Sequence, residues 1–140
     1  MDTKTEVPMA QIPEDASHLL EGKHLAHVAT LMSDGSPQVT PVWIGREGDI
    51  ITFNTAKGRL KEKNLKRDPR VAISIIDSEN PYVPLVIQGK AIEITEEGAD
   101  ADIDALAKRY LDADSYPFRQ PGEERIIVRI EPDKATYQNG

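Results

Sequence analysis

The sequence contains no cysteine. That absence excludes disulfide bonds, a thiolate nucleophile and metal sites built on cysteine ligands. The chain also lacks any apolar run that approaches the roughly 20 residues needed to cross a bilayer. Its first residues, 1–8, are polar and acidic, whereas a secretory signal begins with basic residues and continues with an apolar stretch. We therefore expect a cytoplasmic protein.

The usual parts of a hydrolase or metal enzyme are missing as well. No Gly-x-Ser-x-Gly motif is present, so nucleophilic catalysis by serine has no recognisable elbow. His24 and His27 fall in one expected strand at an odd separation, which turns their side chains to opposite sides of the sheet and prevents them from sharing a metal ion. The sequence thus indicates no catalytic residue and no metal ligand.

Positive charge is scarce overall, because the net charge is −7. This argues against general binding to nucleic acids or anionic membranes, and only one tryptophan is present to stack on bases. The positive charge that exists is concentrated in a basic island, residues 57–70, with seven positive and two negative residues, a local charge of +5. Its cations are Lys57, Arg59, Lys61, Lys63, Lys66, Arg67 and Arg70.

Length and periodicity predict one domain, residues 11–140, after a flexible segment, residues 1–10. A short helix is expected from Ile12 to Gly22, a second helix around Leu60 and Leu65 ending before Asp68, and a third from Glu96 to Leu111. Alternating or β-branched runs predict six strands, at residues 24–32, 38–44, 50–54, 71–76, 83–94 and 125–130.

We expect the first three strands to form an antiparallel meander, residues 77–81 to be a loop, and Gly89 to lie at a bulge or bend. Residues 112–124 are polar and contain proline, which predicts a loop. The fold class is therefore α+β, mainly β, a six-stranded antiparallel barrel with a few flanking helices.

The placement of the basic island favours phosphate binding. Its first cations, at positions 57, 59, 61 and 63, follow the end of a strand at every second residue, and Gly58 lets the backbone approach a ligand closely before a helix begins. Cations, exposed amides and a helix N-terminus favour the same anionic group. The alternative is a solvated amphipathic helix whose charges serve solubility.

Each of the other candidate ligand-binding side chains has a structural role as an alternative interpretation. Trp43 is either a flat wall for an aromatic ring or a core residue. Asn54 and Thr55 end a strand with hydrogen-bonding side chains, which grip a ligand or simply form a turn. Tyr82 has the same two interpretations.

An ordered set of motifs gives the chain a resemblance to the pyridoxamine 5'-phosphate oxidase-like split β-barrel superfamily, in particular to its branch that uses coenzyme F420, a deazaflavin. The resemblance runs from about His24 to Ile130. It is carried by Ala29-Thr30-Leu31, Asp34-Gly35-Ser36-Pro37, Thr40-Pro41-Val42-Trp43, the run from Phe53 to Leu65, Arg67-Asp68-Pro69-Arg70-Val71, Asn80-Pro81-Tyr82, Gln88-Gly89-Lys90-Ala91 and Gly122-Glu123-Glu124-Arg125.

This resemblance implies a split barrel of the FMN-binding type and a homodimer with a cofactor in each groove between the subunits. The cofactor phosphate would lie against Asn54, Thr55, Lys57, Gly58, Arg59, Lys61, Lys63 and Asn64. The cofactor ring would lie near Thr40, Pro41, Val42 and Trp43, with Tyr82 and Val83 contributed across the interface.

The resemblance leaves the cofactor open, because relatives bind FMN, the deazaflavin or haem, all of them anionic. The deazaflavin tail carries a phosphodiester and several glutamates, which suits a broad basic island. We therefore expect an F420-dependent reductase that passes a hydride from the reduced deazaflavin to an electron-poor unsaturated small molecule, with the proton supplied by water or a side chain such as that of Tyr82. The alternatives are an FMN-dependent oxidoreductase and a non-catalytic carrier of a flavin or deazaflavin.

Overall fold

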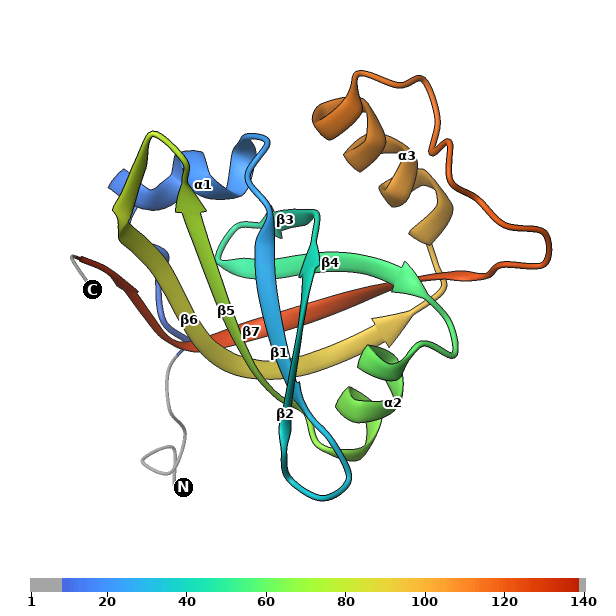
Figure 1. The fold of residues 1–140 in the computed structure, drawn as a ribbon, viewed down its shortest axis with the longest axis horizontal. Coiled ribbons are helices and arrows are strands. Elements are labelled where there is room, and N and C mark those ends of the chain that lie inside the picture. The colour runs from blue at the N-terminus through green and yellow to red at the C-terminus, as the bar shows by residue number, and fades with distance from the viewer. Residues whose placement is uncertain (1–8, 139–140) are drawn as a thin grey trace, which may run out of the picture.

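The computed structural model describes residues 9–138, which form one curled antiparallel sheet of seven strands with short helices around it (Figure 1). The helical segments are a 3-10 turn at Glu14–Ala16, α1 (Ser17–Glu21), α2 (Leu60–Arg67) and α3 (Ala99–Leu111). The strands are β1 (Ala26–Leu31), β2 (Pro37–Val42), β3 (Ile44–Glu47), β4 (Ile50–Ala56), β5 (Arg70–Asp77), β6 (Asn80–Thr95) and β7 (Arg125–Tyr137). The predicted class, mainly β with flanking helices in a split barrel, is confirmed.

The predicted number of six strands and the meander are wrong. The strand order is β2-β1-β5-β6-β7-β4-β3, so β2 and β3 lie at opposite edges of the sheet although Trp43 alone separates them in sequence. A link this short requires the two edges to approach each other, which curls the sheet into a half-barrel. Val42 and Ile44 are both buried, so the alternation of buried residues continues across Trp43. For this reason the sequence pattern did not reveal that β2 ends and β3 begins there.

The inner face of the sheet forms the core. Strand β1 buries every second residue, and the same alternation runs along β5, as expected of strands with one face toward the core. Phe53 of β4 is fully buried there. Leu19 and Leu20 of α1 are also buried and join this core, so the predicted N-terminal helix covers one end of the barrel (Figure 1).

The outer face of β1, β2, β5 and β6 is almost free of charge. Pairing places Val39, Ala29, Ala72 and Gln88 in one row across these four strands. The next row consists of Pro41, His27, Ser74 and Val86. A groove of about 400 Å³ crosses this face. In a chain with 29% charged residues, such a face is unusual for one that remains in contact with water.

Strands β6 and β7 form a long ribbon that is bent at Gly89, as predicted. The register of the pair shifts between Gln88 and Gly89, and a Cβ atom on Gly89 would lie 2.3 Å from the carbonyl oxygen of Glu131. A glycine is therefore required at this bend. The predicted loop at residues 77–81 is instead a tight hairpin, because Asp77 already pairs with Asn80.

The remaining boundaries follow the sequence closely. Helix α2 ends before Asp68-Pro69 as predicted, and α3 begins at Ala99 because the preceding Gly98 has a φ of 77°. No helix among residues 9–138 is long and apolar enough to cross a membrane. Of the predicted flexible segment 1–10, residues 1–8 lie outside the described residues; the Ala10 amide donates to the carbonyl of Pro132 at 2.8 Å.

Candidate functional site

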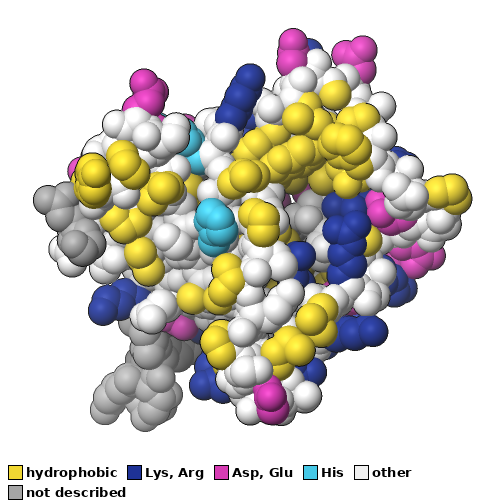
Figure 2. Space-filling view, viewed as in Figure 1, with side chains coloured by type: hydrophobic (Ala, Val, Ile, Leu, Met, Phe, Trp, Pro, Cys, Tyr) yellow, Lys and Arg dark blue, Asp and Glu magenta, His cyan; other side chains and the backbone are white. Residues whose placement is uncertain are grey.

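A pocket of about 210 Å³ opens where the end of β4, the start of α2 and the segment 112–124 meet. In Figure 2, hydrophobic side chains gather on one side of a hollow and Lys and Arg side chains lie directly beside them. The pocket is lined by Leu25, Pro41, Val42, Trp43, Asn54, Thr55, Arg59, Lys61, Ile103, Tyr116, Phe118 and Arg125. One wall is therefore aromatic and apolar, whereas the other is cationic.

Three cations form the polar wall. Arg125 is the most enclosed, with its side chain 3% exposed, and its guanidinium lies 5.0 Å from the ring centre of Tyr116. Lys61 is half-buried, and burial followed by the nearby charges of Arg59 and Arg125 holds the pKa of its amine below the usual value. Within residues 9–138, Lys61 forms no ion pair. This wall therefore carries positive charge that the protein itself does not neutralise.

The polar wall also contains a hydroxyl without a partner. Thr55 is 1% exposed, and its Oγ1 has no hydrogen-bond partner among the described residues. A buried hydroxyl without a hydrogen bond is costly, and such groups mark places where a ligand or water completes the bonding. Because Thr55 lines the pocket beside Lys61 and Arg59, its hydroxyl is available to an anionic ligand.

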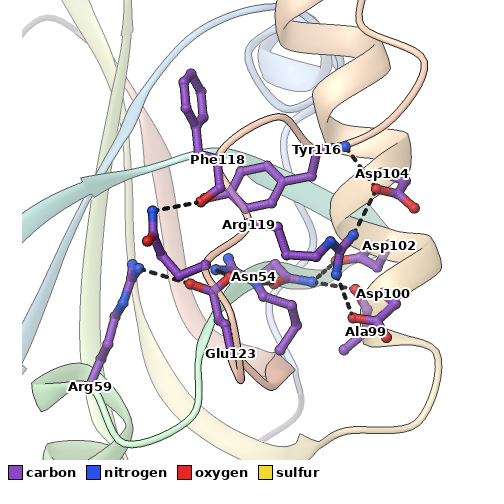
Figure 3. A network of polar contacts seen from close by, with 12 residues as sticks. Asn54, Arg59, Ala99, Asp100, Asp102, Asp104, Tyr116, Phe118, Arg119 and Glu123 are labelled. Carbon is purple, nitrogen blue, oxygen red and sulfur yellow. Dashed lines mark hydrogen bonds and ion pairs between the residues drawn. The ribbon is translucent and has the colours of Figure 1, made fainter.

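Asn54, in contrast, spends both of its donors inside the protein. Its side-chain nitrogen donates to the carbonyl of Ala99 and to Asp102, both at 2.9 Å. Its side-chain oxygen accepts from Arg125 Nε at 2.8 Å. Figure 3 shows this amide linking α3 to the cationic wall. Asn54 therefore orients Arg125 and has no free donor for an anionic ligand.

Asp102 lies behind this network. Burial raises the pKa of its carboxyl above the ordinary value of 3.8, although the hydrogen bond from Asn54 opposes that effect. The carboxyl is not directed into the pocket, because it is absent from the pocket lining and lines instead a separate hollow with Arg109 and Thr52. We assign it a supporting role.

The aromatic wall is built around Trp43. Its ring stacks on Tyr110 of α3 at 5.3 Å with an angle of 14° between the planes, and meets Tyr116 edge to face at 6.0 Å. The Tyr110 hydroxyl accepts from the Ile44 amide and donates to the His24 carbonyl. Trp43 is therefore fixed from behind, which leaves a rigid apolar surface toward the pocket.

The segment 112–124 closes one side of the pocket and is tied to α3. Asp104 accepts from the backbone amide of Tyr116 at 2.8 Å and pairs with Arg119 at 3.0 Å, and Arg119 also pairs with Asp100. Figure 3 shows these contacts beside the pocket. Tyr116 and Phe118 are thereby held at the opening.

Half of the predicted site residues line this pocket. The expected ring-binding residues Pro41, Val42 and Trp43 meet the expected phosphate-binding residues Asn54, Thr55, Arg59 and Lys61. Segments far apart in the sequence are therefore brought together as predicted.

The other predicted residues do not line the pocket. Lys57 instead pairs with Glu96 and Glu124, and these carboxylates raise the pKa of its amine. Gly58 donates its amide to Glu62 at 2.6 Å, and Asn64 is buried against Thr30. The remaining residues lie elsewhere: Lys63 is exposed on α2, Thr40 has a buried hydroxyl without a described partner, and Tyr82 and Val83 lie near the β5–β6 turn.

Sequence reasoning from charge missed Arg125, Tyr116, Phe118, Leu25 and Ile103. They come from β7, the segment 112–124, the residue before β1, and α3. The sequence contained a weak indication of Arg125, because a charged residue at the start of an apolar strand contributes nothing to the core. It contained no indication of Tyr116 and Phe118, because a polar loop with proline does not reveal which part of the fold it covers.

Comparisons with known proteins agree with the geometry. The family model for pyridoxamine 5'-phosphate oxidase matches residues 12–139. A solved protein named F420 reductase is 32% identical, with a TM-score of 0.78 over 89% of this chain and 98% of that chain. Two further solved proteins share the fold. A conserved hypothetical protein of Mycobacterium tuberculosis is 23% identical, with a TM-score of 0.74 over 98% of this chain and 90% of that chain. A protein of Listeria innocua named putative pyridoxamine 5'-phosphate oxidase is 18% identical, with a TM-score of 0.69 over 91% of this chain and 98% of that chain. The chain therefore belongs to the pyridoxamine 5'-phosphate oxidase-like superfamily of split β-barrels.

Proposed function

We propose that the pocket binds coenzyme F420, and that the protein uses this cofactor to reduce an electron-poor unsaturated small molecule. The observation that carries the proposal is the pairing, within one pocket, of two different walls. One is cationic, only partly neutralised, and includes the Thr55 hydroxyl, which has no partner among the described residues; the other is rigid and apolar, at Trp43. A phosphate-bearing ring cofactor matches both walls at once.

The cationic wall fits the phosphodiester of the cofactor. Arg59 offers a planar fork of donors and Lys61 a mobile point charge, and the Thr55 hydroxyl supplies a further bond. Burial, followed by the positive charges of Arg59 and Arg125, lowers the pKa of the Lys61 amine, and an added anion would oppose both effects. These residues would hold the cofactor; Asn54 would act by holding Arg125.

The apolar wall fits the ring. When bound, the reduced deazaflavin supplies a hydride. The residues of this chain would orient the ring against Pro41, Val42 and Trp43 and exclude water with Tyr116 and Phe118. No dedicated acid or base is required of them, and a proton can come from water.

Two observations favour the deazaflavin over FMN. The relative at 32% identity is named F420 reductase. In addition, positive charge continues from the pocket along the exposed side of α2, where Lys63, Lys66 and Arg67 are exposed, beyond the reach of a single compact phosphate. This extended cationic surface suits a tail of several carboxylates.

We further propose that a second copy of the chain covers the uncharged outer face of β1, β2, β5 and β6. Depletion of charge is the compositional mark of the centre of an interface, and the charged groove residues Arg70 and Asp133 are already paired within the chain, with Asp68 and Lys90. The pocket volume of about 210 Å³ also falls below the roughly 300–1,000 Å³ of typical ligand pockets. A second copy would complete it.

The test is a parallel titration of the purified protein with coenzyme F420 and FMN, followed by cofactor fluorescence at low and moderate salt. Micromolar binding of F420 in preference to FMN supports the proposal. Preferential binding of FMN would assign the protein to flavin chemistry, and binding of neither would overturn the proposal.

A second experiment distinguishes an enzyme that reduces a substrate with F420 from a protein that only stores or carries the cofactor. A panel of activated alkenes and quinones is mixed with the protein and reduced F420, and oxidation of the cofactor is followed by absorbance. Tight binding without oxidation of the cofactor by any compound would favour a non-catalytic carrier instead.

A further inference from the structure

Glu123 is paired with two cations of the cationic wall, Arg59 and Arg125, although it does not itself line the pocket. Its side chain is 7% exposed, which is rare for a carboxylate unless it is paired. One of its oxygens accepts from Arg125 Nη1 at 3.0 Å, and the other lies 3.7 Å from Arg59 Nη2. Figure 3 shows this carboxylate between Arg59 and the network around Asn54.

The charges around Glu123 do not balance. Arg59, Lys61 and Arg125 all line the pocket, and Glu123 is the carboxylate within ion-pairing distance of this set among the described residues. Three positive charges against one negative charge leave two in excess. The contact with Arg59 is also longer than a hydrogen bond, so Glu123 satisfies Arg125 well and Arg59 poorly.

The backbone near Glu123 is fixed by hydrogen bonds, whereas its carboxylate is held by Arg125 and Arg59. The neighbouring Glu124 carbonyl accepts from the Lys57 amide at 2.7 Å, and the Glu123 amide donates to the Gln120 carbonyl at 3.1 Å. An anion that takes over the two arginines would therefore have to change the rotamer of Glu123 but not its backbone.

We propose that Glu123 is an internal counter-ion that a phosphate-bearing ligand displaces, so that Glu123 sets the affinity and the charge selectivity of the site. A ligand with two or more negative charges, such as pyrophosphate or a phosphodiester followed by tail carboxylates, matches the excess of the wall, whereas a ligand with one carboxylate only replaces Glu123 without gain. The site therefore selects polyanionic ligands over those with a single carboxylate. This inference rests on the proposed function for the identity of the ligand, but not for its charge.

The experiment compares Glu123→Gln with wild type, using pyrophosphate and acetate as probes and then coenzyme F420. The amide keeps the shape of the side chain and removes its charge. We expect pyrophosphate and F420 to bind about tenfold more tightly to the variant because no carboxylate competes. The matched control is Glu47→Gln, which also removes a carboxylate paired with an arginine, Arg129, at 2.9 Å, and should leave the affinities within about twofold.

The variant is also expected to be less stable without ligand, because Arg125 loses its ion pair. If Glu123→Gln does not fold, Glu123→Asp retains the charge but cannot reach both arginines, and a smaller gain in pyrophosphate affinity is expected. Equal or weaker binding of pyrophosphate to the folded variants would overturn the inference.

The two proposals fail separately. If wild type binds F420 but Glu123→Gln binds it no more tightly, the proposed function stands and the inference is wrong. If wild type binds neither F420 nor FMN while Glu123→Gln binds pyrophosphate more tightly, the counter-ion inference stands and the proposed function is wrong.

Discussion

Lys57 and Lys61 belong to the same basic island but meet different environments. Lys57 points to Glu96 and Glu124 and is half-exposed, so its charge is already neutralised. Lys61 lines the pocket between two arginines. Lys57 lies in the turn directly after β4, whereas Lys61 lies in the first turn of α2, which begins at Leu60. Cations of one sequence motif therefore divide into structural and ligand-binding residues.

Lys61→Ala should weaken the binding of F420 by about tenfold or more, since a charge-assisted bond to phosphate is lost. Isothermal titration at moderate salt measures the change. Lys63→Ala removes an equal charge from an exposed position of α2 outside the pocket, where it would meet only the cofactor tail, and should weaken the binding of F420 by a smaller factor, about threefold. Equal losses in both variants would mean that the island acts only through its general field.

Asp102→Asn should raise the free energy of unfolding at neutral pH. Burial raises the folded-state pKa of Asp102 above 3.8. Between 3.8 and this raised pKa the folded protein therefore binds more protons than the unfolded chain, so the free energy of unfolding falls as the pH rises through that range. The amide stays neutral and can still accept from Asn54. Urea unfolding at several pH values should show a gain at pH 7 that disappears below 3.8. A less stable variant at pH 7 would contradict this.

For single residues, the sequence showed which side chains could bind an anion better than it showed where those side chains point. Arg59 and Lys61 were found by their charge and spacing, and both line the pocket. Asn54 was identified by its polarity, yet its two donors bond to Ala99 and Asp102 and its oxygen accepts from Arg125. These partners lie at least 45 residues away, and no local pattern shows which of two hydrogen-bonding roles such a side chain takes.

At the scale of elements, Trp43 marks a boundary between two strands that the alternation of buried residues could not predict. The residues on either side of it keep the alternation of a single strand. The β1–β2 hairpin was predicted correctly, whereas residues 45–47, expected as part of a turn, belong to β3 and pair with β4. What could not be predicted is that the second strand divides, because the division follows from which edges of the sheet meet, and that is decided by the pairing of β7 with β4 and β6.

Gly89→Ala should destabilise the fold by about 2–3 kcal/mol, since the added Cβ must displace backbone rather than a flexible side chain. The comparison variant is Gly35→Ala, where nothing lies within 4 Å of the added atom and only a φ of 87° opposes it, at a cost of about 1 kcal/mol. Thermal and urea unfolding give both values. A milder effect at position 89 than at position 35 would show that the bend in β6 relaxes easily.

Asp104→Ala should loosen the segment 112–124, because its carboxylate holds both Tyr116 and Arg119. We expect faster hydrogen exchange in residues 113–120 and F420 binding weaker by several-fold, with a stability loss of about 1 kcal/mol. Lys108→Ala, which removes an exposed ion pair between Lys108 and Asp112 from the helix side, serves as the control. Unchanged exchange in Asp104→Ala would mean that packing of Tyr116 alone closes the pocket.

At the scale of the whole molecule, the uncharged outer face predicts assembly. Val86→Asp places a charge in the middle of this face, where Val86 pairs with Ser74 of β5 and Thr136 of β7. We expect the variant to sediment as a monomer while wild type sediments as a dimer, and to bind F420 at least about tenfold more weakly. Leu111→Asp, at an exposed apolar position of α3, should change neither. A wild-type monomer at micromolar concentration would reject the dimer.

The place of β7 in the sheet has a consequence for synthesis on the ribosome. Strands β2, β1, β5 and β6 form one continuous piece and β4 with β3 another, and β7 joins the two by pairing with both β6 and β4. Until residues 125–137 emerge, each piece therefore presents an open edge to other nascent chains. The core can close only when this strand, the last of the sheet to be made, enters between them, so an emerging chain depends on shielding of these edges up to that moment.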